Sequence, residues 1–240
     1  MTTPSSVFGH DNLNDIFLRT FKDCTQGIIN SLSTDANDPA TAIAIQAILA
    51  QLNHDYNRLV SVVDIIQDRI YRDAPWASAA VVVYDLVAMF IDSYISHPNL
   101  PLRGPLLIQH QLMKALQAQF TSMVTADSWS SGFTYFLKQL CQSKDSIRRL
   151  TPGIMLHIMS GMVDSAHLFS DGNLDLLFEI INAAGPVSDT QASDVVNEFG
   201  GKIQRLQNLV RGRGNVVGMA VFGLVRLREL GWNVTVNESA

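Results

Sequence analysis

Apolar residues recur along almost the whole chain at intervals of three and four, the spacing of one buried face of an α-helix. The clearest run passes through Leu59, Val62, Val63, Ile66 and Ile70, and similar runs follow Val195 and Val217. The period of two that is typical of half-buried strands is nearly absent. This pattern predicts an all-α protein.

Proline and capping residues divide the periodic segments. Asp38-Pro39 and Thr151-Pro152 each place proline at the first helical turn, directly after a residue type that caps helix N-termini. The segments give about ten helices joined by short connections, so successive helices should pack antiparallel. We expect a HEAT-like α-solenoid of about five antiparallel helix pairs, two of which are close to the roughly 40 residues of such a repeat. The expected helices are roughly 12–32, 39–53, 57–72, 75–96, 101–125, 128–142, 151–168, 173–185, 189–211 and 215–231.

The chain has no long linker, so one domain is expected over residues 12–232, with short tails at 1–11 and 233–240. Of the 240 residues, 47% are apolar and 16% charged, which excludes an intrinsically disordered chain. A net charge of −5 argues against a surface built throughout to bind nucleic acid. Cys24 and Cys141 are too far apart for a metal knuckle and form no disulfide framework, which favours a reducing compartment.

Neither a signal peptide nor a membrane-spanning segment is evident in the sequence, which predicts a soluble intracellular protein.

Sequence motifs for catalysis are missing. The segment before Gly201-Lys202 carries Val196 where a phosphate-binding loop would need glycine, and the metalloprotease and esterase motifs do not occur. The histidines never lie four residues apart, the spacing that puts two metal ligands on one helix face. They are His10, His54, His97, His110, His157 and His167. We therefore expect no enzyme activity, no metal and no cofactor.

Positive charge gathers near the C-terminus of this acidic chain, with six cations and no carboxylate between Lys202 and Arg228. Solvated helix faces explain any single one of them, but together they suggest an edge that binds an acidic partner surface or a phosphate backbone. The candidate partner-binding residues are Lys202, Arg205, Arg211, Arg213 and Arg226.

Arg228 differs from these cations because it falls on the apolar stripe of its helix, whereas Arg226 points to the opposite side. A structural role is expected for Arg228, with its guanidinium paired to a carboxylate or reaching solvent. Trp232 follows Gly231, a residue type that ends helices, and is expected to dock as an apolar lid.

The last helix ends on Leu227, Arg228, Gly231 and Trp232 in the order L-R-x-x-G-W, which resembles the end of the middle domain of the eukaryotic translation initiation factor 4G family. Other segments follow the family's order. Leu112-x-x-x-Leu116-Gln117-x-x-Phe120 resembles its mid-domain helix, and the stripe from Leu174 to Gly185 resembles its seventh helix. Pro75-Trp76 stands where the family places an aromatic residue before a small-residue helix. The chain is most similar to the small members, the poly(A)-binding-protein-interacting proteins and the stand-alone interactors of the histone stem-loop-binding protein.

This resemblance implies a non-catalytic adaptor in mRNA translation or mRNA metabolism. The implied partners are translation initiation factors, a DEAD-box helicase of the initiation factor 4A type or an mRNA-bound protein, with direct RNA contact secondary and homodimers an option. The implied location is the cytoplasm, with the nucleus as a second compartment. Two alternatives stay open: a helical-repeat interaction protein of another pathway, such as trafficking or nuclear transport, and an RNA-binding module.

Overall fold

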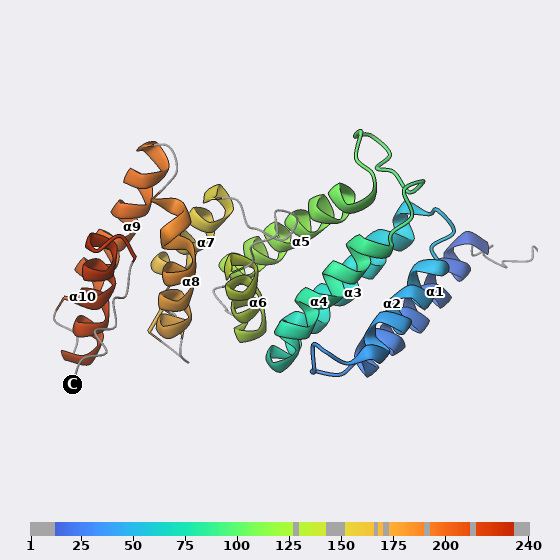
Figure 1. The fold of residues 1–240 in the computed structure, drawn as a ribbon, viewed down its shortest axis with the longest axis horizontal. Helices are drawn as coiled ribbons and strands as arrows, with labels where there is room; N and C mark the ends of the chain where they lie inside the picture. Colours follow the sequence, from blue (N-terminus) through green and yellow to red (C-terminus); the bar gives the residue numbers. More distant parts are fainter. Residues whose placement is uncertain are drawn as a thin grey trace, which may run out of the picture.

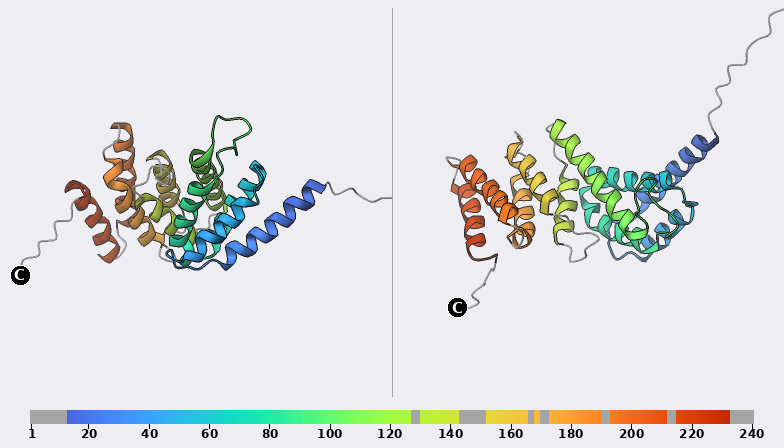
Figure 2. Two further views of the ribbon diagram at one scale, coloured as in Figure 1. Left: turned by 45° about the vertical axis from the view of Figure 1, so that its right-hand side comes forward. Right: turned by 90° about the horizontal axis from the view of Figure 1, so that it is seen from above.

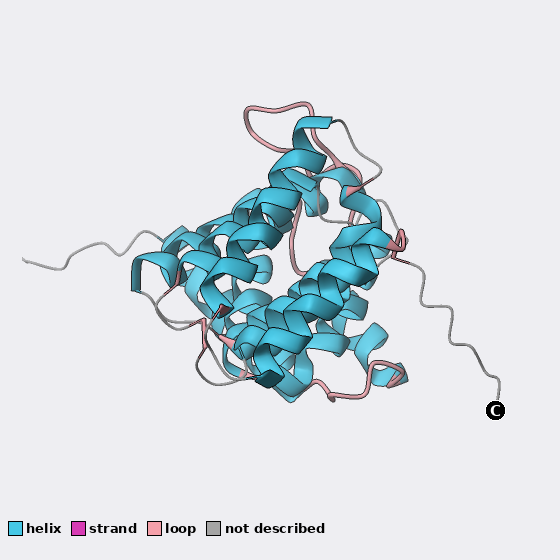
Figure 3. Ribbon diagram, turned by 90° about the vertical axis from the view of Figure 1, so that its left-hand side faces the viewer, coloured by secondary structure: helices cyan, strands magenta, loops and turns pink. Residues whose placement is uncertain are grey.

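The computed structural model describes residues 13–126, 130–142, 152–165, 168–169, 173–189, 193–211 and 215–232, and over these residues the chain is helical without a β-strand (Figure 3). The all-α prediction is confirmed. The helices are α1 (Leu13–Ser31), α2 (Pro39–Ala50), α3 (Tyr56–Arg72), α4 (Ala77–Phe90), α5 (Gly104–Ala126), α6 (Ser131–Gln142), α7 (Pro152–Asp164), α8 (Asn173–Ser188), α9 (Ser193–Val210) and α10 (Asn215–Glu229), with a short 3₁₀ turn over Ala74–Trp76. The predicted tails 1–11 and 233–240 lie outside the described residues.

The helices pack in two rows that alternate along the chain. In one row α1 contacts α3, α3 contacts α5, α5 contacts α7 and α7 contacts α9; in the other α2 contacts α4, α4 contacts α6, α6 contacts α8 and α8 contacts α10. The rows follow the long axis of the molecule, with α1 and α2 at one end and α10 at the other (Figures 1 and 2). Contacts between α3 and α6, α4 and α5, α7 and α8, and α9 and α10 join the two rows to each other.

The core is continuous through the centre of the molecule. Its largest fully buried side chains include Trp76, Tyr84, Phe133 and Phe136. Tyr84 accepts a hydrogen bond on its hydroxyl from the side-chain amide of Gln67 at 2.8 Å, which provides a polar partner inside the apolar core. Burial raises the pKa of the Tyr84 phenol above its ordinary value, so the hydroxyl stays protonated at physiological pH.

Helix starts follow the sequence signals. Asp38 caps α2 by accepting a hydrogen bond from the backbone N–H of Ala40 at 2.9 Å, and Pro39 occupies the first turn, as predicted. Asp55 caps α3 in the same way, accepting from the N–H of Asn57 at 2.7 Å. The two caps fix the points at which α2 and α3 begin.

The predicted helix bounds were wrong by a few residues at several ends, since α2 ends at Ala50 rather than 53, α5 begins at Gly104 rather than 101 and α7 ends at Asp164 rather than 168; the largest difference is at α4. The periodicity predicted a helix over 75–96, but α4 ends at Phe90 and the chain becomes extended at Ile91. Asp92 causes the difference, since its side chain accepts the backbone N–H of Tyr94 at 2.8 Å and competes with the helical hydrogen bonds. The loop over 91–103 that results projects beyond the helices (Figure 1) and contains one antiparallel bridge between Ser96 and Arg103.

Within the described part of the chain, no helix combines the length and the apolarity that crossing a bilayer requires.

Candidate partner-binding surface

The L-R-x-x-G-W ending of α10 forms a compact structural cluster. Gly231 adopts φ +64°, a left-handed conformation that glycine allows, and its N–H donates to the carbonyl of Arg228 at 2.9 Å. The N–H of Trp232 donates to the carbonyl of Leu227, also at 2.9 Å. These two bonds make the Schellman motif, which satisfies the last carbonyls of the helix and turns the chain back.

Arg228 pairs with a carboxylate, as its place on the apolar stripe predicts. Its Nη2 lies 2.8 Å from Oδ1 of Asp189, its Nε donates to both carboxylate oxygens of Asp189, and its guanidinium carbon lies 5.3 Å from the ring centroid of Phe199. The indole N–H of Trp232 donates to Oδ2 of Asp189 at 2.7 Å. Asp189 thus joins α10 and the Trp232 indole to the end of α8. Its carboxylate is engaged in holding the fold.

Trp232 covers the end of α8. A Cβ atom at Gly185 would overlap the six-membered ring of the indole, so only glycine leaves room for the tryptophan there. Phe199 of α9 packs beside the same indole at a ring-centroid distance of 5.9 Å. The pair Gly185 and Trp232 therefore joins α8, α9 and α10, and this end of the chain is held together by packing as well as charge.

The predicted cations mostly have partners nearby. Arg205 of α9 lies 2.6 Å from the carboxylate of Asp164 in α7, and Lys202 donates to the hydroxyl of Ser160 at 2.8 Å. Arg226 pairs with Glu229 in its own helix at 2.8 Å. Arg211 is exposed, and Arg213 lies outside the described residues. Carboxylates outside residues 202–228 therefore offset part of the positive charge that this segment carries in the sequence.

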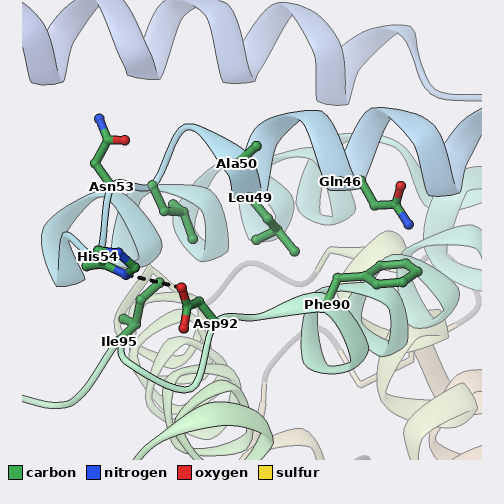
Figure 4. Close-up of a pocket in the computed structure, with 9 residues that line it drawn as sticks. Gln46, Leu49, Ala50, Asn53, His54, Phe90, Asp92 and Ile95 are labelled. Atoms are coloured by element: carbon green, nitrogen blue, oxygen red, sulfur yellow. Dashed lines mark ion pairs between the residues drawn. The ribbon is translucent and has the colours of Figure 1, made fainter.

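A cleft of about 390 Å³ lies at the other end of the molecule, between α2 and the end of α4. Gln46, Leu49 and Ala50 of α2 line one side, and Phe90 and Asp92 line the other (Figure 4). The turn after α2 and the loop after α4 close one end of the cleft with Leu52, Asn53, His54 and Ile95. Apolar and polar groups share its lining about equally, and three of the polar residues, Asn53, His54 and Asp92, gather at the closed end.

Those polar groups centre on one ion pair. Nδ1 of His54 lies 3.2 Å from Oδ2 of Asp92, and both side chains are partly exposed (Figure 4). The imidazole also meets the ring of Tyr94 edge-on at a centroid distance of 5.9 Å. Asn53 and His54 have φ of 50° and 59°, a left-handed conformation that is unfavourable for a histidine. The turn holds His54 in this conformation and places its ring against Asp92.

The surface beside the cleft is apolar and exposed. Ile43 lies one turn before Gln46 on the same face of α2 with 71% of its surface exposed, and Met89 of α4 is 69% exposed. Phe90 and Tyr94 are exposed as well. Helix α2 contains no ionisable side chain, although much of it faces solvent. We call the cleft, together with the exposed residues Ile43, Gln46, Ala50 and Phe90, the α2–α4 face.

Sequence reasoning did not single out this face. The signal was present, because a helix without any charged residue is unusual on the outside of a protein. The meeting of His54 with Asp92 could not be read from the sequence, since the loop that carries Asp92 was predicted as helix.

Metal or catalytic chemistry gains no support from the described residues. No three of their His, Cys, Asp or Glu side chains come together as metal ligands would. His97 and His110 contact each other, with ring centroids 5.4 Å apart, but Nδ1 of His97 accepts the backbone N–H of Asn99 at 3.0 Å. These rings stabilise the 91–103 loop against α5.

Comparison with known proteins identifies no relative: no family model matches the chain and no curated protein matches it. The function is therefore argued from the geometry of the α2–α4 face and from the resemblance of the motifs.

Proposed function

We propose that this protein is a non-catalytic adaptor that binds other proteins through the α2–α4 face. The observation that carries the proposal is the exposed, uncharged surface of α2 beside a cleft with one carboxylate. Apolar surface of this kind, rimmed by polar groups, is typical of protein-binding sites. A rigid stack of helices suits this role because it holds such a face in a fixed shape.

We further propose that the two rows of helices are a HEAT-like α-solenoid and that the adaptor acts in mRNA translation or mRNA metabolism. The alternation of helices between two rows supports the repeat architecture, and the L-R-x-x-G-W ending supports the pathway. The proposed partners are a translation initiation factor, a DEAD-box helicase of the initiation factor 4A type or an mRNA-bound protein. Tethering two of them on one scaffold raises their effective concentration for each other.

Direct RNA binding is the less favoured activity. A phosphate backbone would have to displace the carboxylates that already contact Arg205 and Arg226. Both pairs are exposed, so each contributes little to stability and still lowers the local positive potential.

Affinity purification of the full chain from cell extract, with and without ribonuclease, tests the proposal. We expect translation or mRNA-processing proteins to be recovered in both conditions and to be lost with Ile43→Asp. Met219→Asp on α10 is the matched control, because Met219 is 73% exposed and Ile43 is 71% exposed. Partners that bind equally well to both variants, or that disappear with ribonuclease, would contradict the proposal.

A further inference from the structure

The shape of the α2–α4 face restricts the backbone of whatever binds there. The face is made of two helices and offers no free sheet edge, although the last carbonyls of α2 and α4 lie near the closed end of the cleft. An extended peptide buried against it would lose the water bonded to its own backbone and find few partners in return. A helix satisfies its backbone internally and loses nothing.

The spacing of the exposed side chains fits the same conclusion. Ile43, Gln46 and Ala50 follow one another at intervals of three and four along α2, and Phe90 lies across the cleft from Gln46 and Ala50 (Figure 4). Grooves between helices accept an amphipathic helix whose apolar residues recur at the same intervals. Seven residues of α2 span about 10 Å, the length of two turns of such a helix.

The charges of the residues that line the cleft indicate which charge the partner carries at one end. Among the described residues that line the cleft there is no lysine or arginine, and Asp92 is the only carboxylate. Oδ1 of Asp92 accepts the Tyr94 N–H and Oδ2 meets His54, yet the side chain keeps 40% of its surface exposed. A cation on the partner could approach this carboxylate while the rest of the helix covers apolar surface.

We propose that the α2–α4 face binds an amphipathic helix of another protein, with apolar side chains against Ile43, Leu49 and Phe90 and a Lys or Arg that pairs with Asp92. This inference rests on the proposed adaptor function and names the chemistry of the partner. The negative charge of the chain as a whole, −5, favours the approach of such a basic helix.

Two synthetic helical peptides of about 15 residues test the inference. Both carry leucine at positions i, i+3, i+4 and i+7 on a background of alanine and glutamine; one has arginine at both ends and the other glutamate. Fluorescence anisotropy with the full chain measures their affinities. We expect the arginine peptide to bind at least about tenfold more tightly, because a close charge pair at an interface contributes that much.

Three variants locate the effect. Asp92→Asn should reduce the preference for the arginine peptide to less than about threefold, and Ile43→Asp should weaken both peptides about tenfold. Met219→Asp should change neither affinity. Equal affinities for the two peptides, a preference that survives in Asp92→Asn, binding that Ile43→Asp leaves intact, or no binding at all would each overturn the inference.

A second measurement uses the native partner. A photoreactive residue at position 43 of the full chain, activated in cell extract, should cross-link to segments that are amphipathic helices with a Lys or Arg near one end. Cross-links to an extended or acidic segment, or to a second copy of this chain, would overturn the inference. If neither peptide binds but Ile43→Asp still abolishes partner recovery, the adaptor function stands and the proposed partner chemistry is wrong. If the peptides bind as expected but no mRNA-related protein is recovered, the proposed pathway is wrong and the partner chemistry stands.

Discussion

Replacing Arg69 should destabilise the N-terminal half of the molecule by a predictable amount. Arg69 is buried, with 8% of its surface exposed, and it donates hydrogen bonds to the carbonyls of Ile29 and Leu32, the latter at 2.9 Å. Both carbonyls lie at the C-terminal end of α1, where helical partners run out. The guanidinium also lies over the ring of Trp76, 4.2 Å from its centroid. The Arg69 side chain of α3 therefore links the C-terminal end of α1 to Trp76 in the core.

The magnitude follows from what Arg69→Met leaves behind. The Leu32 carbonyl loses the Arg69 donor, at about 1–3 kcal/mol for a buried group, whereas the Ile29 carbonyl keeps the N–H of Leu32 at 3.3 Å and loses less. The pair with Asp73 at 3.3 Å adds little, because the Asp73 side chain is 36% exposed. Burial lowers the pKa of Arg69, which shows that desolvation opposes its charge and that removing the charge recovers part of the loss. We expect the free energy of unfolding to fall by about 2–4 kcal/mol.

Urea unfolding followed by circular dichroism at the helical band measures this loss. Arg72→Met on the same helix is the control, since Arg72 is exposed, and it should stay within about 0.5 kcal/mol of the wild type. Arg69→Lys should fall between the two, because a single ammonium group cannot reach both carbonyls in the geometry of the guanidinium fork. Equal stability of Arg69→Met and Arg72→Met would show that the hydrogen bonds from Arg69 to the end of α1 do not stabilise the fold.

Three further outcomes are expected. Gly132→Ala should lose about 1–3 kcal/mol in urea unfolding, because a Cβ there would overlap the Ile70 carbonyl, whereas Gly27→Ala, which faces open space in α1, should gain about 0.5–1 kcal/mol. Partial desolvation raises the pKa of Asp64 above its ordinary 3.8, although the side chain is exposed and the charges of Lys22 and Lys114 oppose the shift; Asp64→Asn should therefore be more stable than the wild type at pH 7 by less than about 1 kcal/mol, with the difference closing as the pH falls toward 3.8. Trp232→Phe keeps the apolar ring but loses the bond to Asp189, and thermal unfolding should show a loss of about 1 kcal/mol.

Most helices could be placed from the sequence because each buries one stripe, and burial of one stripe imposes the period of 3.6 directly on the residues. The ends of the helices were less predictable, as residues 91–96 illustrate, since they were predicted as helix and form a loop. Their apolar residues continue the helical pattern, but a hydrogen bond from the Tyr94 N–H to the side chain of Asp92 outweighs it. A single local polar bond decides whether the chain continues as helix, and periodicity carries no information about it.

The charge of the surface was harder to predict than the fold, because ion pairs form between residues that lie far apart in the sequence. Arg205 follows no carboxylate closely in sequence, yet α7 brings Asp164 to it at 2.6 Å. The same holds for Arg228: its pairing with some carboxylate could be inferred from its place on the stripe, whereas the identity of Asp189 depends on how α8 ends. A run of cations in a sequence therefore describes a surface only after the packing of neighbouring helices is known.

Exposed apolar side chains occur at both ends of the molecule, and only the chemistry around them separates the two places. Met219 and Phe222 stand out from α10 beside Arg226, whose charge Glu229 already neutralises. At the α2–α4 face the apolar side chains border a cleft whose one carboxylate among the described residues, Asp92, pairs with His54 and still has 40% of its side-chain surface exposed. Binding energy concentrates where apolar contacts surround a polar group that a partner can complete, not where apolar area alone is large. This difference is why Ile43→Asp and Met219→Asp, almost equal in exposure, are expected to differ in binding.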